Sequence, residues 1–351
     1  MRELLRHLTL LVTALTLLLA GATSVSADPV PVGNLRVPPL DGGSGTVRLM
    51  AVGDVMLAQS IGRRIKQDGP LAPWAKVKPY FDQADLVVAN LECVISDRGT
   101  PWRKTFTFRA PIAAAQSLVA GGIDAVTDAN NHAVDYGFDS FADTLHYLDA
   151  AGVGHFGGGA NLAAARAPLI LTRNGLRIAF LGYVLPFSGK PAFNTKQWAA
   201  TASSSGLAIG YPDVVTADVK AAKQLADIVI VMVHGGIEYS FQPSKAQKKF
   251  DVAAFNAGAA LVIGAHPHVL QGYVFQNHQA IAYSEGNFVF DRFTGNENDT
   301  AILDVTLSAD GVDSLNWIPI EIHNGFPRPA TSTEAARIMS HLKRLPLPSI
   351  P

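Results

Sequence analysis

Ala259-Ala260-Leu261-Val262-Ile263-Gly264-Ala265-His266-Pro267-His268 is the stretch that says most about the fold and the chemistry of this chain. Its first half is a continuous apolar run, which is typical of a strand buried on both faces. The two histidines stand two residues apart, so an extended backbone would place both rings on the same side of the strand end. Open α/β sheets bind ligands at the carboxyl ends of their strands, and neutral imidazole is a common ligand of transition metals. The stretch predicts a metal site at a sheet edge, although a lone His-x-His pair also occurs in ordinary surface loops.

Similar apolar runs recur along the chain and alternate with segments of helical spacing. The predicted strands are Val47–Val52, Asp85–Ala89, Ile123–Val126, Ile178–Leu181, Ile228–Val233, Ala259–Ile263 and Ala280–Tyr283. The predicted helices are Phe138–Ala151, Val214–Leu225 and Lys245–Ala257. This alternation indicates an α/β protein whose sheets are covered by helices. Asn174-Gly175 and Asp310-Gly311 are typical of tight hairpins, so we expect mixed rather than purely parallel sheets.

The ends of the chain differ from this core in composition. Residues 1–27 read as an export signal, because basic residues precede the apolar stretch Leu8–Ala22 and small residues follow it. That stretch is shorter than the roughly 20 residues that span a bilayer, so cleavage is favoured over anchoring. Residues 28–46 are expected to form a linker, 47–325 the folded domain, and 326–351 a peripheral C-terminal tail. The protein is therefore expected to be exported: secreted, periplasmic or held at the cell surface.

The net charge limits the classes of binding partner that we expect, and the cysteine count bears on how the fold is stabilised. The 351 residues carry a formal net charge of −1, which argues against a general nucleic-acid binder. We expect no nucleic-acid partner, but instead a small anionic molecule or a polymer held locally. The single cysteine, Cys93, cannot form an internal disulfide and reads as a core residue. An exported protein of this kind must rely on core burial and on bound metal for its stability.

Polar clusters follow the apolar runs again and again. They are Gly53-Asp54, Asn90-Leu91-Glu92, Asn130-Asn131-His132, His234–Glu238, Gly264–His268 and Ser284–Phe288. Buried strands rarely end this way repeatedly without a shared purpose, so we expect these clusters to meet in one site.

The residue types in these clusters suit a hydrolytic site with two divalent ions. The predicted ligands are the carboxylates of Asp54 and Glu92, the amide oxygen of Asn131, and the imidazoles of His234, His266 and His268. This oxygen and nitrogen set fits Mn, Zn or Fe. A carboxylate can bridge two cations about 3.5–4 Å apart, and the pair can activate a water molecule. His132 is predicted to be the general acid that protonates the leaving group.

Taken in order, and together with Asp135-Tyr136-Gly137, Tyr239 and Tyr283, these motifs resemble the CapA family, named for poly-γ-glutamate capsule biosynthesis. That family is similar to the calcineurin-like metallophosphoesterases. The resemblance covers about Val47 to Arg292. It implies a four-layer αββα sandwich of two mixed β-sheets flanked by helices. It also implies that Asp54 and His268 hold one metal, that Glu92 bridges, that Asn131, His234 and His266 hold the other metal, and that His132 is the acid.

Two positions depart from the phosphoesterase pattern. Met56 stands where that pattern has a histidine ligand, and a thioether is a poor ligand for hard cations. Glu92 stands where the wider superfamily uses aspartate. The leading interpretation is an exported metal-dependent hydrolase acting on an anionic cell-envelope substrate. The alternatives are a non-catalytic component that binds poly-γ-glutamate, in a membrane-bound capsule synthesis complex, and a peptidase acting on γ-glutamyl bonds.

Supporting roles are predicted for a few further residues. Glu238 could orient a ligand histidine or pair with a basic residue, and Asn287 is expected to hydrogen-bond a neighbouring loop rather than a metal. Arg103, Lys104 and Arg109 could grip an anionic substrate or could form a solvated basic loop.

Overall fold

The computed structural model describes residues 45–189, 193–291 and 293–348. The predicted export signal (1–27) and almost all of the predicted linker (28–46) lie outside these residues. None of the helices in the described part combines the length and the apolar character that crossing a membrane would require. The structure therefore bears on the predicted domain and on most of the predicted tail.

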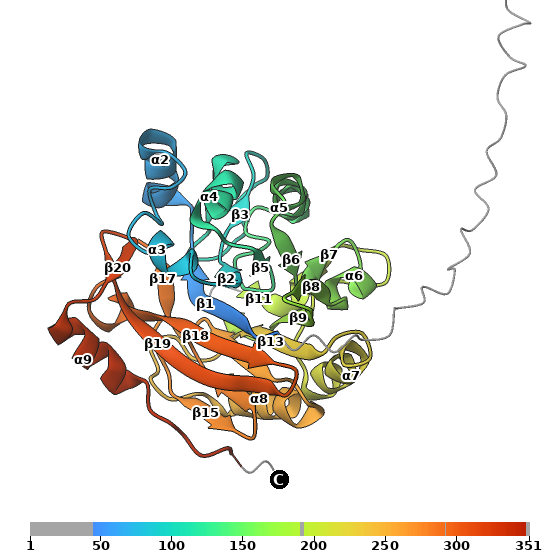
Figure 1. Ribbon diagram of the computed structural model, residues 1–351. Helices are drawn as coiled ribbons and strands as arrows, with labels where there is room; N and C mark the ends of the chain where they lie inside the picture. Colours follow the sequence, from blue (N-terminus) through green and yellow to red (C-terminus); the bar gives the residue numbers. More distant parts are fainter. Residues whose placement is uncertain (1–44, 190–192, 292, 349–351) are drawn as a thin grey trace, which may run out of the picture. The chain divides into compact units, whose positions relative to one another are not determined.

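A mixed sheet of eight strands runs through the described residues (Figure 1). In spatial order its strands are β20 (Phe326–Pro329), β19 (Gly311–His323), β18 (Asp299–Ser308), β1 (Val47–Val55), β2 (Leu86–Leu91), β5 (Ala125–Thr127) and β6 (Gly154–Phe156), and β17 (Asn287–Val289) pairs with the end of β1. The half from β1 to β6 is parallel, and β18 to β20 are antiparallel.

A second mixed sheet of six strands packs against the first. Its strands in spatial order are β15 (Tyr273–Gln276), β16 (Gln279–Ala282), β14 (Leu261–Ala265), β13 (Ile228–His234), β9 (Leu176–Val184) and β8 (Leu169–Arg173). The four central strands are parallel, and the two edge strands are antiparallel to their neighbours. The apolar run before His266 thus lies at the centre of this sheet, where Leu261–Ala265 form β14.

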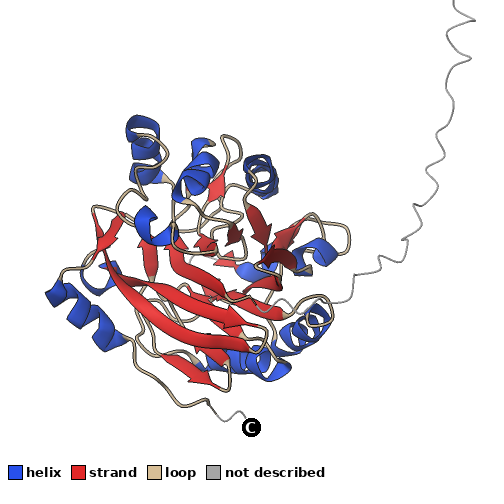
Figure 2. Ribbon diagram, in the orientation of Figure 1, coloured by secondary structure: helices blue, strands red, loops and turns tan. Residues whose placement is uncertain are grey.

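Helices cover the outer face of each sheet (Figure 2). The first sheet carries α2 (Gln59–Asp68), α3 (Lys78–Phe81), α4 (Ala113–Gly121) and α5 (Phe138–Ala151), and the second carries α7 (Pro212–Ala222) and α8 (Lys245–Ala257). Shorter or peripheral elements are β3 (Val94–Ile95), β4 (Arg109–Ala110), β7 (Gly158–Gly159), α6 (Leu162–Arg166), β10 (Ser188–Gly189), β11 (Phe193–Asn194), η1 (Thr195–Trp198), β12 (Gly206–Leu207), η2 (Gly295–Asn298) and α9 (Ser332–His341).

The apolar alternation along β1 shows why this strand is buried on both faces. Met50 and Val52 pack against the helices, whereas Leu49 and Ala51 pack between the two sheets. Successive side chains of a strand point to opposite faces, so an uninterrupted apolar run fills both layers of core. The expected four-layer αββα sandwich of two mixed sheets is confirmed.

The hairpin signals were also good guides. Asn174 and Gly175 both have positive φ, of 50° and 84°, and they join β8 to β9. A tight hairpin of this kind needs positive φ at both central residues, which asparagine and glycine tolerate best. Gly311, with φ 124°, likewise begins the strand after the Asp310 turn.

The segment after residue 325, expected to be a peripheral tail, begins with a strand. Phe326 pairs with His323, so β20 is the edge strand of the first sheet and continues the domain. Farther on, α9 buries Ile338 against Leu270 and Ala301. Pro327 and Pro329 lie on this edge strand, where a missing backbone N–H is tolerated.

Candidate metal centre

The predicted ligands from the first sheet lie at or just beyond the carboxyl ends of its parallel strands. Asp54 is near the end of β1, Glu92 follows β2, and Asn131 lies in the loop after β5. All three side chains are buried, and Asp54 and Glu92 are completely so. Parallel neighbours end at the same sheet edge, which is why residues far apart in the chain meet here.

Gly53 makes the position of Asp54 possible. The pairing of β1 with β2 shifts register at this residue, and a Cβ atom on Gly53 would lie 1.9 Å from the carbonyl oxygen of Gly286. Only glycine permits so close an approach of two backbones. The tight packing brings Asp54 beside Asn287, its register partner on β17.

The second sheet supplies the histidines. His234 is the last residue of β13, and β14 ends at Ala265, directly before His266. His266 and His268 have positive φ, of 99° and 58°. The expectation that an extended strand would align the two rings is therefore wrong. A turn in a conformation that L-residues rarely adopt carries them instead, and such strain is typical of functional sites.

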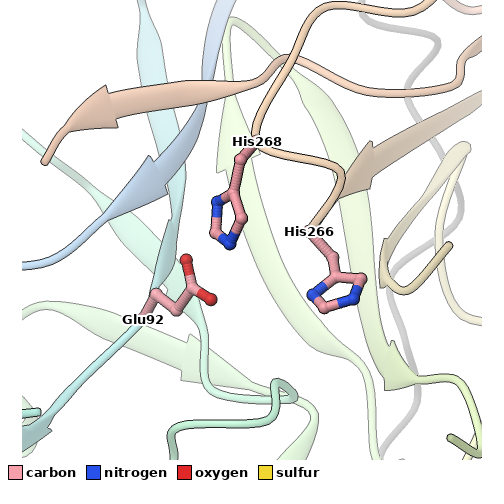
Figure 3. A group of neighbouring side chains, drawn as sticks. All are labelled: Glu92, His266 and His268. Carbon is pink, nitrogen blue, oxygen red and sulfur yellow. The ribbon is translucent and has the colours of Figure 1, made fainter. Parts of the chain in front are cut away.

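Glu92, His266 and His268 form a compact group (Figure 3). One ligand atom from each lies within 4.8 Å of the others, and all three residues are buried. Figure 3 shows the Glu92 carboxylate lying toward the two imidazoles, which come from one turn. One acidic group and two imidazoles at this spacing can converge on a single cation.

The hydrogen-bonding state of this group fits a metal ion. Both oxygens of Glu92 and the Nδ1 atom of His266 are buried without a hydrogen-bond partner among the described residues. Leaving a buried polar atom unpaired costs about 1–3 kcal/mol, and more for a charged group. The oxygen and nitrogen donors suit Mn, Zn or Fe, and a cation between them would satisfy all three atoms.

Protonation in the metal-free protein reflects the same lack of partners. Burial raises the pKa of Glu92 well above its usual value, and the neighbouring Asp54 raises it further. Burial also lowers the pKa of His266 well below its usual value. Both shifts reflect the cost of burying a charge, and a bound cation would reverse the effect on Glu92 by stabilising its ionised form.

His268 is oriented by two acceptors. Its Nδ1 atom lies 2.8 Å from Oδ1 of Asn287 and 3.2 Å from Oδ2 of Asp54. A proton on Nδ1 leaves Nε2 as the ring's lone-pair atom, which is the tautomer that a ligand histidine needs. Burial, the largest single effect, lowers the pKa of His268, but the hydrogen bonds to Asp54 and Asn287 and the nearby negative charges together raise it overall.

Asn90 connects the remaining predicted ligands. Its Nδ2 atom donates to Asp54 Oδ1 at 2.8 Å and lies 3.1 Å from Nδ1 of His234. On the other side of that ring, Nε2 of His234 lies 2.8 Å from Oδ1 of Asn131. His234 also approaches Glu92, with 3.6 Å between Nε2 and Oε1. The six predicted ligands therefore share one buried neighbourhood.

His132 lies beside this group and is held through its Nδ1 atom. Its Nδ1 atom is 2.6 Å from Oδ2 of Asp135, and its Nε2 atom is 3.9 Å from Oε1 of Glu92. Nζ of Lys104 donates to Oδ1 of Asp135 at 2.8 Å and to the backbone oxygen of Asn131. Burial lowers the pKa of His132 to about 4; Asp135 opposes this shift, and Lys104 adds to it.

Comparison with known proteins shows the family of the chain. A family model described as "Bacterial capsule synthesis protein PGA_cap" matches residues 48–292. The chain belongs to this family. It is 30% identical over 289 residues to the capsule biosynthesis protein CapA of Bacillus anthracis, covering 80% of this chain and 69% of that protein. It is 31% identical over 281 residues to the PGA biosynthesis protein CapA of Bacillus subtilis, covering 79% and 72%.

Among solved structures, a putative 5′-nucleotidase from Staphylococcus aureus aligns with a TM-score of 0.47 and 13% identity. That alignment covers 85% of this chain, which spans only 58% of the nucleotidase chain.

Within this PGA_cap domain, Met56 is a core residue. It is completely buried in the apolar cluster beneath the helices of the first sheet, and its sulfur accepts the Ala58 backbone N–H at 3.2 Å. The position that would carry a histidine in the phosphoesterase pattern is part of the core here.

Three further polar residues near the site, Glu238, Asn287 and Glu285, lie in different environments. Glu238 is exposed, and its carboxylate makes no hydrogen bond or ion pair with the described residues. Asn287 donates to the backbone oxygen of Glu297 at 3.0 Å, as expected for a loop contact, and it also orients His268. Glu285 is buried, and burial raises its pKa to about 8.

The basic segment divides into three different environments. Arg103 is exposed, whereas the side chain of Lys104 is only 7% exposed and lies beside His132. Arg109 stacks over Tyr136, 4.4 Å from the ring centre, and donates to the backbone oxygen of Arg98. Neither a common anion grip nor a wholly solvated loop describes the three residues.

Sequence reasoning missed two functional features. Asn90 was quoted within a motif but given no role, and Asp135 was not linked to Lys104. Asn90 could have been found from its two-residue spacing from Glu92, because it is the penultimate residue of the buried strand β2, which Glu92 directly follows. Nothing in the local sequence brings Lys104 to Asp135, because loop packing alone joins them.

Proposed function

We propose that this protein is an exported, divalent-metal-dependent hydrolase that acts on an anionic substrate of the cell envelope. The observation that carries the proposal is the buried group of Glu92, His266 and His268, with three ligand-type atoms lacking partners. A scaffold without metal would gain stability by filling such a site with apolar or hydrogen-bonded side chains. The capsule-related relatives favour a capsule polymer of the poly-γ-glutamate type as the substrate class, and a phosphoester is the alternative that the metal chemistry allows.

The chain's own residues would divide the work. A divalent ion held by Glu92, His266 and His268 supplies Lewis-acid chemistry suited to hydrolysing phosphate or carbonyl compounds. Asp54, Asn131 and His234, which share the same neighbourhood, would hold a second ion if one binds. Asn90 and Asn287 fix the orientation of the ligand rings through hydrogen bonds.

His132 would handle the proton of the leaving group. Asp135 accepts a hydrogen bond from Nδ1–H of His132. Nε2 is therefore the atom that would exchange a proton with the substrate. In the free protein the ring is neutral at pH 7, because its pKa is about 4. An anionic substrate beside Nε2 would raise that pKa and so favour the protonated acid.

Elemental analysis of protein purified without chelators tests the metal assignment. We expect bound Mn, Zn or Fe in the wild type and its loss from His266→Ala and His234→Ala. His278→Ala is a matched control, since His278 is an exposed histidine that pairs with Asp313. Hydrolysis of phosphomonoester, phosphodiester and γ-glutamyl substrates should fall with the metal. Unchanged metal content and turnover in His266→Ala and His234→Ala would refute the site.

Met56 supports a second candidate function. Because this residue is packed in the core, one metal position lacks a ligand that hydrolases of the phosphoesterase pattern use. A non-catalytic component that binds poly-γ-glutamate in a membrane-bound synthesis complex would tolerate that loss. The two functions differ for His132→Ala: the binding component keeps its full function, whereas the hydrolase keeps substrate binding and loses turnover.

A further inference from the structure

A second cavity, of about 580 Å³, lies beside α2 and is lined by side chains that the metal centre does not use. Gln59, Arg63 and Lys66 of α2 form one wall, and Arg109 of β4 forms another. Figure 1 shows α2 and α4 side by side above the first sheet, where this cavity lies. Asp97 is the one acidic residue among those that line it.

The cations of this cavity lack acidic partners. Arg63 and Lys66 are exposed, lie three residues apart on one helix face, and make no hydrogen bond or ion pair with the described residues. Arg109 is held by a backbone oxygen and by the Tyr136 ring, and neither neutralises its charge. Three positive charges therefore face one cavity against a single carboxylate.

Neighbouring arginines outside the cavity are paired. Arg64, adjacent to Arg63 on the same helix, bonds Asp68 at 2.9 Å and stacks over Phe326. Arg98 forms an ion pair with Asp143. The lack of acidic partners is thus a property of the cavity rather than of this whole surface.

Gln59 adds an unsatisfied acceptor. Its side-chain oxygen is buried and has no hydrogen-bond partner among the described residues. A ligand that presents both a carboxylate and an amide N–H would satisfy the cations and this oxygen together.

The chain also links this cavity to the metal centre. Glu92 is followed closely by β3, which pairs with β4, and Ser96, directly after β3, lines the cavity. The cavity wall therefore begins four residues after Glu92 along the chain.

We infer that this cavity binds a carboxylate of an anionic, amide-linked polymer of the poly-γ-glutamate type, in addition to the segment that reaches the metal centre. The inference rests on the anionic substrate of the proposed function, but it requires binding only. Arg63, Lys66 and Arg109 contact the carboxylate, and Gln59 accepts from the polymer backbone.

The test is the binding of labelled poly-γ-glutamate to the full chain, followed by fluorescence anisotropy at low and at physiological salt. We expect the double variant Arg63→Gln/Lys66→Gln to bind about tenfold more weakly, and its salt dependence to be smaller. Arg64→Gln, on the same helix but outside the cavity, should bind like the wild type. Metal content should be the same in all three proteins.

Two further arms separate the possible outcomes. His266→Ala protein should still bind the polymer through this cavity, so failure of the metal assignment would leave the inference standing. Equal affinity of the double variant and Arg64→Gln would overturn it. Tighter binding of polyphosphate than of poly-γ-glutamate, lost in the same double variant, would overturn the carboxylate assignment.

Discussion

Two neighbouring regions of the site differ in how well their buried polar atoms are hydrogen-bonded. One is the group of Glu92, His266 and His268, and the other is the network around His132. Glu92 and His266 keep buried ligand atoms without partners. In the network, Asp135 accepts from Lys104, from the Phe108 backbone and from His132. Unpaired buried atoms cost stability and indicate a ligand yet to bind, whereas a satisfied network holds a side chain in place. The first region has unpaired atoms of the kind that bind a cation, and the second holds the His132 ring through hydrogen bonds.

Asp135→Asn should have the largest effect on the free energy of unfolding, because it removes the buried ion pair with Lys104. It would leave the Lys104 ammonium buried beside a neutral group, and breaking a buried ion pair typically costs about 3–5 kcal/mol. Urea denaturation of metal-free protein measures the change. Asp82→Asn is the matched control, since Asp82 also pairs with a lysine, but on the surface; we expect it to cost less than about 1 kcal/mol. Similar losses for both variants would contradict the contrast.

Metal addition should have the next largest effect. Binding to the folded state alone stabilises it by about 2.7 kcal/mol when free metal exceeds the dissociation constant a hundredfold. Calorimetry of chelator-treated protein with and without added Mn²⁺ or Zn²⁺ measures the shift in melting temperature. Asp135→Asn should keep this shift and His266→Ala should lose it. A shift of equal size in His266→Ala would mean that the metal binds elsewhere.

Some features of the fold and the site could be predicted from the sequence, and others could not. The apolar run before His266 and the Asn174-Gly175 pair act through local rules, so β14 and the first hairpin followed directly. The turn at His266 and His268 depends on positive φ at two residues that do not favour it, and periodicity cannot reveal that.

Long-range packing explains the other misses. Lys104 reaches Asp135 only because the loop that carries it folds over the end of β5. The burial of Met56 depends on helices placed over the first sheet, and β20 depends on pairing with β19. Residue types and spacing gave the set of ligands to expect, but not which atoms remain unpaired.

Glu92→Gln should have a smaller effect, of opposite sign in the two states. Without metal, the neutral amide avoids burying an unpaired carboxylate, so we expect a gain of about 1–3 kcal/mol at pH 7. With metal, the variant should lose the stabilisation seen in the wild type.

The pH dependence of this gain follows from the raised pKa of Glu92. Below its ordinary value of 4.5, the carboxyl group is protonated in the folded and unfolded states alike, and the two proteins should differ little. As the pH rises from 4.5 toward the folded-state pKa, only the wild type loses stability. Comparing the two proteins cancels the histidines, which they share. A gain that is independent of pH would argue against the charge as its cause.

Met56→Leu should have the smallest effect, and it tests whether Met56 belongs to either region. The swap nearly conserves volume in a well-packed core, so we expect a cost below about 1.5 kcal/mol and an unchanged metal affinity. Met56→His places an imidazole in the same apolar cluster, so it should destabilise the protein by about 1–3 kcal/mol without adding a ligand. Titration calorimetry and urea denaturation measure both quantities. Tighter metal binding by Met56→His would show that a side chain at position 56 can reach the metal. Position 56 would then belong to the metal site rather than to the core.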